Sequence, residues 1–231
     1  MAYISVIIAS GGKSSRMNGI NKQLLELDGV PVIIRSIKAF ENHHCISEIV
    51  VVCQLQLHEK LQELIKKFGV RKKIIIAQAG ETRQKSVFNG VKQCAYNTDY
   101  FMIHDGARPF VGSEMIDCAL ELAYKKKAVI VAVTSKDTVK ICDNQNQIIE
   151  TPQRNHTYLA QTPQIFCAKL YHRAMQQAIT QQQDFTDDAQ LIESIGIPVF
   201  ISQGSYGNIK ITTVDDVALA QIILEKERCC K

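Results

Sequence analysis

The sequence contains no apolar run that approaches the roughly 20 residues needed to span a bilayer. Its first twelve residues carry no basic side chain, so the opening apolar run is expected to be a strand and not a signal peptide. Both absences favour a cytoplasmic protein without a membrane partner.

Cysteine motifs are also missing. The chain has eight cysteines, but no two of them have Cys-x-x-Cys spacing. Several lie in apolar runs, such as Cys53 at the end of EIVVVC, so buried thiols in a reducing compartment are expected and disulfides are not. The six histidines, among them the adjacent His43 and His44, show no ligand spacing that would indicate zinc.

A strong excess of charge of one sign is absent as well. The formal net charge is +4, and the 46% apolar and 22% charged residues are ordinary for a globular protein, so no nucleic-acid partner is required. The densest basic segment, residues 66–73, holds five cations in eight residues and is expected to end an exposed helix. A groove for a phosphate backbone is the alternative for this segment.

The stretch IASGGKSSRM, residues 8–17, resembles the end of a Walker loop but does not match one. That motif needs a glycine five positions before Gly12, and Ile7 is found there. No Gly-x-Gly-x-x-Gly pattern is present either. A loop of small residues after a strand still exposes backbone N–H groups to an anion, and Lys13, Arg16 and Lys22 add positive charge. A solvated surface turn is the alternative.

Short β-branched runs alternate with helical patterns over the first 135 residues. This alternation predicts βαβ units, and therefore an α/β fold with a mostly parallel sheet covered by helices on both faces. No linker interrupts the chain, so residues 1–231 are expected to be a single domain. The expected strands are 3–9, 48–53, 73–78, 100–104 and 128–133, and the expected helices are near 31–42, 56–68, 84–95 and 113–125.

The alternation stops at residues 136–160, which we call the β-arm. Polar residues alternate there around the turn-forming centre DNQN at 143–146, which predicts a β-hairpin with about ten residues on each side. The hairpin has too few apolar positions for a core of its own. A dimerisation arm covered by another chain is the favoured interpretation, and an unpartnered surface excursion is the alternative.

The remaining sequence predicts further regular elements after the β-arm. The segment QTPQIF comes first, followed by a helix near 168–180 and a helix that begins at Thr186. A strand at 198–202, the segment NIKIT at 208–212 and a terminal helix from about 214 complete the chain.

Ligands of an open parallel sheet bind outside the carboxyl ends of its strands. The segments 10–22, 79–86 and 104–110 all follow predicted strands and should meet at one edge. Asp105 comes directly after an apolar strand, and a single strand-end carboxylate suits Mg²⁺ that is held mainly by water and ligand phosphates. The alternative is that Asp105 caps the following turn and pairs with Arg108.

Two further groups of residues are candidates for binding. Arg83 and Ser86 flank the start of a predicted helix, where N–H groups and the helix dipole favour an anion or a base carbonyl. The run Thr186-Asp187-Asp188 is a second candidate metal site, but Thr186 as an N-cap explains the same residues and is favoured.

No set of nucleophile, base and orienting group can be assembled from the sequence. His104 beside Asp105 does not constitute a triad, and the serines of the first loop have no obvious histidine. This agrees with phosphoryl transfer, in which the protein mainly positions the reactants and neutralises charge.

Ten short stretches, in order along the chain, carry a resemblance to a known family. They are SGGKSSRM, NKQ, DGVPVI, GETRQKSV, HDGARPF, KDTVK, ETPQR, QTPQIF, TDDA and NIKITT. Through them the chain resembles the 2-C-methyl-D-erythritol 4-phosphate cytidylyltransferases of the non-mevalonate isoprenoid pathway over nearly its full length. The resemblance implies a Rossmann-like three-layer nucleotidyltransferase fold, a homodimer interlocked by the β-arm, and transfer of CMP from CTP to methylerythritol phosphate with Mg²⁺.

The resemblance also implies a role for each matching position. Arg16 and Lys22 would neutralise the triphosphate and stabilise the transition state, and Asp105 would hold Mg²⁺. The residues implied to surround CTP are Ser10, Gly11, Gly12, Lys13, Gly80, Glu81, Ser86 and Gly106. Those implied to hold the polyol phosphate are Arg108, Thr138, Arg154, Thr162 and Lys210, with Thr138 and Arg154 on the β-arm of the neighbouring subunit. Arg154 and Lys210 count among the catalytic cations, and Arg83 and Ala107 complete the candidate site.

One position departs from the family pattern, and two other functions stay open. The family usually has glycine where Ser14 stands, and serine tolerates positive φ less well, which bears on CTP affinity. Ribitol 5-phosphate cytidylyltransferases share the fold and CTP but tend to carry a larger residue at Ala107, so HDGARPF favours methylerythritol phosphate as substrate. A non-catalytic nucleotide-binding protein is the alternative of another class, and the charged residues present argue against it.

Overall fold

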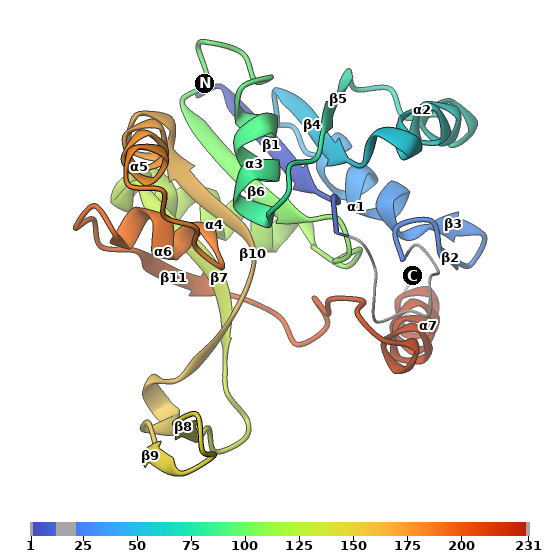
Figure 1. Cartoon of the computed structure of the whole chain (residues 1–231). Helices are drawn as coiled ribbons and strands as arrows, with labels where there is room; N and C mark the ends of the chain where they lie inside the picture. Colours follow the sequence, from blue (N-terminus) through green and yellow to red (C-terminus); the bar gives the residue numbers. More distant parts are fainter. Residues whose placement is uncertain (1, 13–21, 230–231) are drawn as a thin grey trace.

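A computed structural model describes residues 2–12 and 22–229 and shows a seven-stranded central sheet (Figure 1). The strand order is β11-β7-β10-β6-β1-β4-β5. The strands are β1 (Ile4–Ala9), β4 (Glu48–Cys53), β5 (Ile74–Gln78), β6 (Tyr100–Asp105), β7 (Ala128–Thr134), β10 (Tyr158–Cys167) and β11 (Phe200–Gln203). The five strands expected in the first 135 residues are all present, within about one residue at most ends.

The sheet is mostly parallel, as predicted. β1 pairs in parallel with β4 and β6, β4 with β5, and β7 with β11. The exception is β10, which lies antiparallel between β6 and β7 and contains the segment QTPQIF. Its register shifts between Ala160 and Gln164, around a cis peptide bond from Thr162 to Pro163.

Helices cover both faces of the sheet and give the molecule three layers. Successive strand residues point to opposite faces, so Ile8 packs in one apolar cluster and Ile7 in the other, and both are fully buried. The first cluster includes side chains of α1 (Val32–Glu41), α2 (His58–Lys67) and α4 (Ser113–Lys126). The second includes α3 (Arg83–Val91), α5 (Ala168–Thr180) and α6 (Asp188–Glu193). The predicted α/β class is confirmed.

A small third cluster joins a hairpin near the amino end to the carboxyl-terminal helix. The hairpin of β2 (Glu26–Leu27) and β3 (Val30–Pro31) turns at Asp28 and Gly29, whose φ angles are 51° and 68°. Two consecutive positive φ values are typical of the tight hairpin turn that Asp-Gly favours. Leu27 packs with Ile211 and with α7 (Val214–Cys229). The segment 208–212 is not a strand, but it lies against this cluster through Ile209 and Ile211.

The β-arm extends away from the sheet (Figure 1). Apart from the start of β10, its paired strands are β8 (Ile141–Cys142) and β9 (Ile148–Glu150), so the prediction of about ten residues on each side was wrong. The turn is where we expected it, because the Asp143 carboxylate accepts hydrogen bonds from the backbone N–H groups of Gln145 and Gln147. The register of this short ladder shifts between Ile141 and Cys142, and no core covers the hairpin, so Ile148 and Ile149 remain 54% and 64% exposed.

The predicted exposed helix end near residues 66–73 is also found. α2 ends at Lys67, and Lys66, Lys67, Arg71 and Lys73 are exposed. Lys72 differs, because its ammonium group donates to the backbone carbonyl oxygens of His43 and Ile46. None of the described helices combines the length and apolar character needed to cross a membrane.

Candidate active site

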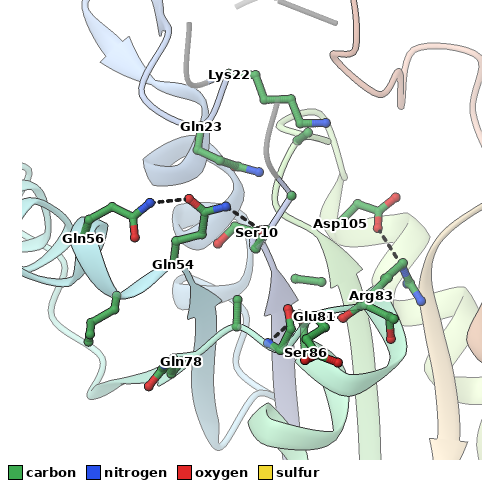
Figure 2. Close-up of a pocket in the computed structure, with 18 of the residues that line it drawn as sticks. Ser10, Lys22, Gln23, Gln54, Gln56, Gln78, Glu81, Arg83, Ser86 and Asp105 are labelled. Carbon is green, nitrogen blue, oxygen red and sulfur yellow. Dashed lines mark hydrogen bonds and ion pairs between the residues drawn. The ribbon is translucent and has the colours of Figure 1, made fainter. Parts of the chain in front are cut away.

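A cavity of about 600 Å³ opens at the carboxyl ends of β1, β4, β5 and β6. The chain order places it there: from β1 the next strands, β4 and β5, lie on one side, and β6 lies on the other. The strand order therefore changes direction at β1, which leaves a crevice beside the end of this strand. Ligands usually bind at this point in sheets of this type. In Figure 2, Lys22 and Gln23 lie on one side of the cavity, and Glu81 and Ser86 lie on the other.

The loops after β1 and β5 approach too closely for side chains. A Cβ atom on Gly11 would lie 2.5 Å from Cβ of Ala79, and one on Gly80 would lie 2.6 Å from Cβ of Lys85. Ser86 then fixes the second loop, because its Oγ accepts from Gly80 N at 3.0 Å and its hydroxyl donates to Thr82 O at 2.8 Å. Backbone atoms of both loops therefore face the cavity, as an anion or base site requires.

Asp105 lies among three cationic side chains at the end of β6. Its Oδ2 is 2.8 Å from Nζ of Lys210 and 3.7 Å from Nε of Arg108, and its Oδ1 is 3.6 Å from Nε of Arg83. Burial by itself raises the pKa of the Asp105 carboxyl, but Lys210, Arg83 and Arg108 together hold this pKa far below its usual range. The carboxylate is thus ionised at any working pH, and Arg108 is one of several partners instead of the sole partner.

The position of Asp105 fits a hard divalent cation. Ionised carboxylate oxygens are the ligands that Mg²⁺ prefers, and Mg²⁺ often takes only one or two of them from the protein. A separation of 3.6 Å from Arg83 Nε is too long for a hydrogen bond, so Oδ1 can contact a cation while Lys210 keeps Oδ2.

Arg83 forms an ion pair with the buried carboxylate of Asp188 on α6. Its Nη1 is 2.6 Å from Oδ2 of Asp188, and the buried Tyr171 hydroxyl donates to Oδ1 of Asp188 at 2.6 Å. Burial lowers the pKa of Arg83, but Asp188 and Asp105 outweigh it and raise the pKa above its ordinary value. Arg83 therefore links α6 to Asp105 and also lines the cavity itself.

The segment Thr186-Asp187-Asp188 is a helix cap, although the predicted cap residue was off by one position. Asp187 is the N-cap of α6, and its carboxylate accepts from the backbone N–H of Gln190 at 3.0 Å. Asp187 directly precedes the helix, so its carboxylate reaches this N–H group, whereas the Thr186 hydroxyl donates to the Gln190 side chain. Asp188 is bonded to Arg83, so its carboxylate is committed to an ion pair.

A chain of hydrogen bonds fixes the backbone at Asp105. The N–H of Asp105 donates to Thr162 Oγ1 at 3.0 Å, and that hydroxyl lies 3.0 Å from Nδ1 of His104. The other ring nitrogen, Nε2, is 2.9 Å from the carbonyl oxygen of Arg108, which can only accept. The proton of His104 is therefore on Nε2, and Nδ1 accepts from Thr162. Burial lowers the pKa of His104 to about 4, so the ring is neutral at pH 7, and both of its nitrogens are used in hydrogen bonds that hold the strand end.

The structure brings most of the expected site residues to this one cavity. Those that line it are Ser10, Gly11, Gly12, Lys22, Gly80, Glu81, Arg83, Ser86, Asp105, Ala107 and Lys210. Gly106 lies behind it, where an added Cβ would meet Ile33 and Ser10 at 3.0 Å. Lys13, Ser14 and Arg16 fall in the segment outside the described residues.

The expected polyol phosphate residues are dispersed within one chain. Thr138 and Arg154 are exposed on the β-arm and are not among the residues that line the cavity. Thr162 uses its hydroxyl in the bond network with His104. Arg108 donates through Nη1 to the carbonyl oxygen of Asn208 at 2.7 Å, and this bond holds the segment that carries Lys210 next to β6.

The sequence reasoning missed a set of glutamines at the cavity. Gln54 and Gln56 follow β4, and Gln54 Nε2 donates to the carbonyl oxygen of Gly11 at 3.2 Å while Gln56 Nε2 donates to Gln54 Oε1 at 2.6 Å (Figure 2). Gln23 and Gln78 line the cavity as well. The rule that ligands bind after parallel strands applied equally to the strand at 48–53 and would have identified Gln54.

The whole chain is similar to proteins of one family. The sequence profile of the 2-C-methyl-D-erythritol 4-phosphate cytidylyltransferase family matches residues 4–226. A protein of that name from Clostridioides difficile is 42% identical over 226 residues, which cover 97% of this chain and 94% of that protein. Another from Caldanaerobacter subterraneus subsp. tengcongensis is 41% identical over 225 residues, covering 96% of this chain and 99% of that protein.

Solved structures agree with the sequence comparison. The crystal structure of 4-diphosphocytidyl-2C-methyl-D-erythritol synthase from Anaerococcus prevotii has a TM-score of 0.87 and 31% identity, covering 97% of this chain and 96% of that chain. A 2-C-methyl-D-erythritol 4-phosphate cytidylyltransferase from Francisella tularensis has a TM-score of 0.82 and 28% identity, covering 96% and 100%.

Proposed function

The chain belongs to the 2-C-methyl-D-erythritol 4-phosphate cytidylyltransferase family, and we propose that the cavity beside β1 is where it transfers CMP from CTP. The protein is thus a nucleotidyltransferase of isoprenoid precursor biosynthesis. A phosphate oxygen of the polyol phosphate attacks the α-phosphorus of CTP, the bond from that phosphorus to the bridging oxygen breaks, and pyrophosphate leaves.

The observation that best supports catalysis in this cavity is that three charged side chains meet there. Lys22, Asp105 and Lys210 come from three segments far apart in the sequence and line a single cavity at the carboxyl edge of the sheet. A transferring phosphoryl group spreads negative charge over its oxygens, and fixed cations stabilise that charge. We place the triphosphate near Lys22, with Arg16 as its expected second cation, and the polyol phosphate near Lys210.

Asp105 is the residue that we expect to hold Mg²⁺. When bound, the ion would neutralise charge on the phosphates of CTP. The cations beside Asp105 keep its carboxylate ionised, and Arg83 keeps it in position. The adjacent backbone at Gly80 and the hydroxyl of Ser86 are proposed to face the nucleotide base and ribose.

Release of pyrophosphate from CTP tests the reaction and its acceptor together. Purified protein with Mg²⁺ and CTP is expected to release pyrophosphate with 2-C-methyl-D-erythritol 4-phosphate and not with ribitol 5-phosphate. The names of the relatives favour this acceptor. Turnover with ribitol 5-phosphate alone would overturn the acceptor, and CTP binding without turnover on either compound would support a non-catalytic nucleotide-binding protein.

The β-arm supports a proposal that the protein works as a homodimer. Ile141, Ile148 and Ile149 are exposed on a segment that has no core of its own. Exposed strand edges with apolar side chains are usually covered by another segment or another chain. In a symmetric dimer, a second copy of this protein would cover the β-arm. Such a dimer would bring Thr138 and Arg154 of one subunit to the cavity of the other, where they would contact the polyol phosphate.

Mixing two inactive variants tests whether the site is shared between subunits. In an Arg154→Ala and Lys22→Ala heterodimer, one of the two sites would keep both residues. After subunit exchange of equal amounts, half of the dimers are mixed, so activity is expected to recover to about a quarter of wild type. Arg173→Ala, an exposed arginine on α5, is the matched single-variant control and should keep full activity. Confirmed exchange without recovery would place Arg154 and Lys22 in the same subunit's site.

A further inference from the structure

A cluster of metal-ligating side chains lies at the opposite end of the sheet from the cavity. His43, His44 and Cys45 are in the loop between α1 and β4, at the amino end of the strand. One ligand atom from each residue lies within 4.8 Å of the others. Their adjacency did not suggest zinc from the sequence, because neighbouring residues do not usually turn their side chains to one point. Here the loop does bring them together.

One side-chain contact and one backbone contact hold the three residues close together. Cys45 Sγ is 3.1 Å from Nε2 of His44, and Nδ1 of His43 accepts from the backbone N–H of Cys45 at 3.3 Å. The two imidazole rings are stacked, with centroids 5.1 Å apart and planes at 18°. A thiolate sulfur and two imidazole nitrogens make a ligand set that suits Zn²⁺ or a similar borderline cation better than Mg²⁺.

A carboxylate on helix α4 orients the buried histidine. Nε2 of His43 is 3.1 Å from Oδ1 of Asp117 on α4, and the His43 side chain is only 1% exposed. This contact places the ring proton on Nε2 and leaves the lone pair of Nδ1 toward Cys45. Metal-ligating histidines typically have such a second partner, which fixes the tautomer and raises the basicity of the ligand nitrogen.

Hydrogen bonds hold His43 and Ile46 of the loop in place independently of a metal. The Lys72 ammonium donates to the carbonyl oxygens of His43 and Ile46, and the backbone N–H of Ile46 donates to His43 O at 3.2 Å. Ligand atoms around one tetrahedral zinc lie about 3.6 Å apart, from bond lengths of about 2.0–2.3 Å. The distance of 3.1 Å between Cys45 Sγ and His44 Nε2 is already within this separation, and the exposed His44 side chain is free to turn toward the ion.

We propose that His43, His44 and Cys45 form a site for one borderline divalent cation such as Zn²⁺, oriented by Asp117 and separate from the nucleotide cavity. Binding replaces the long Cys45 N–H contact to Nδ1 and releases the Cys45 thiol proton to solvent. Three protein ligands leave the fourth position to water, which reaches the site beside His44. The cation would join the α1–β4 loop, through His43, to α4.

Cobalt binding to the reduced, metal-free full chain tests the site. One equivalent of Co²⁺ is expected to give thiolate-to-cobalt charge-transfer absorption, and Zn²⁺ should displace it. Cys45→Ser should abolish the band, His44→Ala should weaken binding, and Asp117→Asn should weaken it about 10- to 100-fold. Cys118→Ser, next to Asp117 on α4 and exposed, is the matched control and should bind as wild type.

Further variants distinguish metal binding at Cys45 from binding at other cysteines. A Cys229→Ser, Cys230→Ser variant removes the adjacent cysteines at the chain end and should keep the band. Zn²⁺ should also raise the unfolding temperature of wild type and of Cys118→Ser but not of Cys45→Ser, because only a ligand bound to the folded state stabilises it. If the band survives in Cys45→Ser, or if wild type takes up no Co²⁺ at stoichiometric concentration, the proposal is wrong.

Discussion

Replacing Lys22 with alanine is expected to lower kcat by on the order of 10² to 10³, equivalent to roughly 2.7–4 kcal/mol of lost transition-state stabilisation. Lys22 lines the cavity opposite Ser86, where we place the triphosphate (Figure 2). Charge on the departing pyrophosphate is greater in the transition state than in bound CTP, so loss of this cation should lower kcat more than it weakens CTP binding. Steady-state pyrophosphate release and CTP titration measure the two effects separately.

Lys60→Ala is the matched control for this change. Lys60 is an exposed lysine on α2 that pairs with Glu63 at 3.1 Å, and an exposed pair of this kind contributes little. Its kcat should equal that of wild type. A Lys22→Ala enzyme with wild-type turnover would remove Lys22 from the catalytic groups.

Replacing Asp188 with alanine is expected to destabilise the fold by about 3 kcal/mol, at the lower end of the usual range for breaking a buried ion pair. The change leaves Arg83 without its nearest carboxylate and leaves the fully buried Tyr171 hydroxyl without its acceptor. Arg83 remains 29% exposed, which lets water offset part of the loss. Urea unfolding gives the free energy of unfolding directly.

Two further variants test whether the loss of stability comes from the ion pair between Arg83 and Asp188. Glu193→Ala removes an exposed carboxylate from the same helix, α6, and should change the free energy of unfolding by less than about 0.5 kcal/mol. Arg83→Met combined with Asp188→Ala should recover part of the stability, because no unpaired cation is left behind. Equal destabilisation by Glu193→Ala and Asp188→Ala would show that the ion pair contributes nothing special.

The strands and helices of the sheet were predictable because their residues repeat the same physical pattern. Segments such as EIVVVC are apolar throughout, and β4 is buried on both faces of the sheet. The antiparallel direction of β10 was not predictable, because it depends on where the chain returns after the β-arm. The β2–β3 hairpin was missed although Asp28-Gly29 is a strong turn signal, because each of its strands has only two residues.

Some residues of the candidate site were likewise predictable from the sequence and others were not. Asp105 could be selected from its position after an apolar strand, since that position alone places it at the binding edge. Lys210 is 105 residues further along and follows no strand, so only the family resemblance selected it. The ion pair between Arg83 and Asp188 was not predicted either, because it needs α3 and α6 to be packed on the same face of the sheet.

Because Lys22, Asp105 and Lys210 are placed around the cavity by the protein fold, they act on whichever phosphates occupy it. The forward and reverse reactions share one transition state, so groups that stabilise it accelerate both directions. On the proposed function, the same site would therefore regenerate CTP from the nucleotide product whenever pyrophosphate accumulates. Net synthesis then depends on a separate hydrolytic reaction that keeps pyrophosphate scarce.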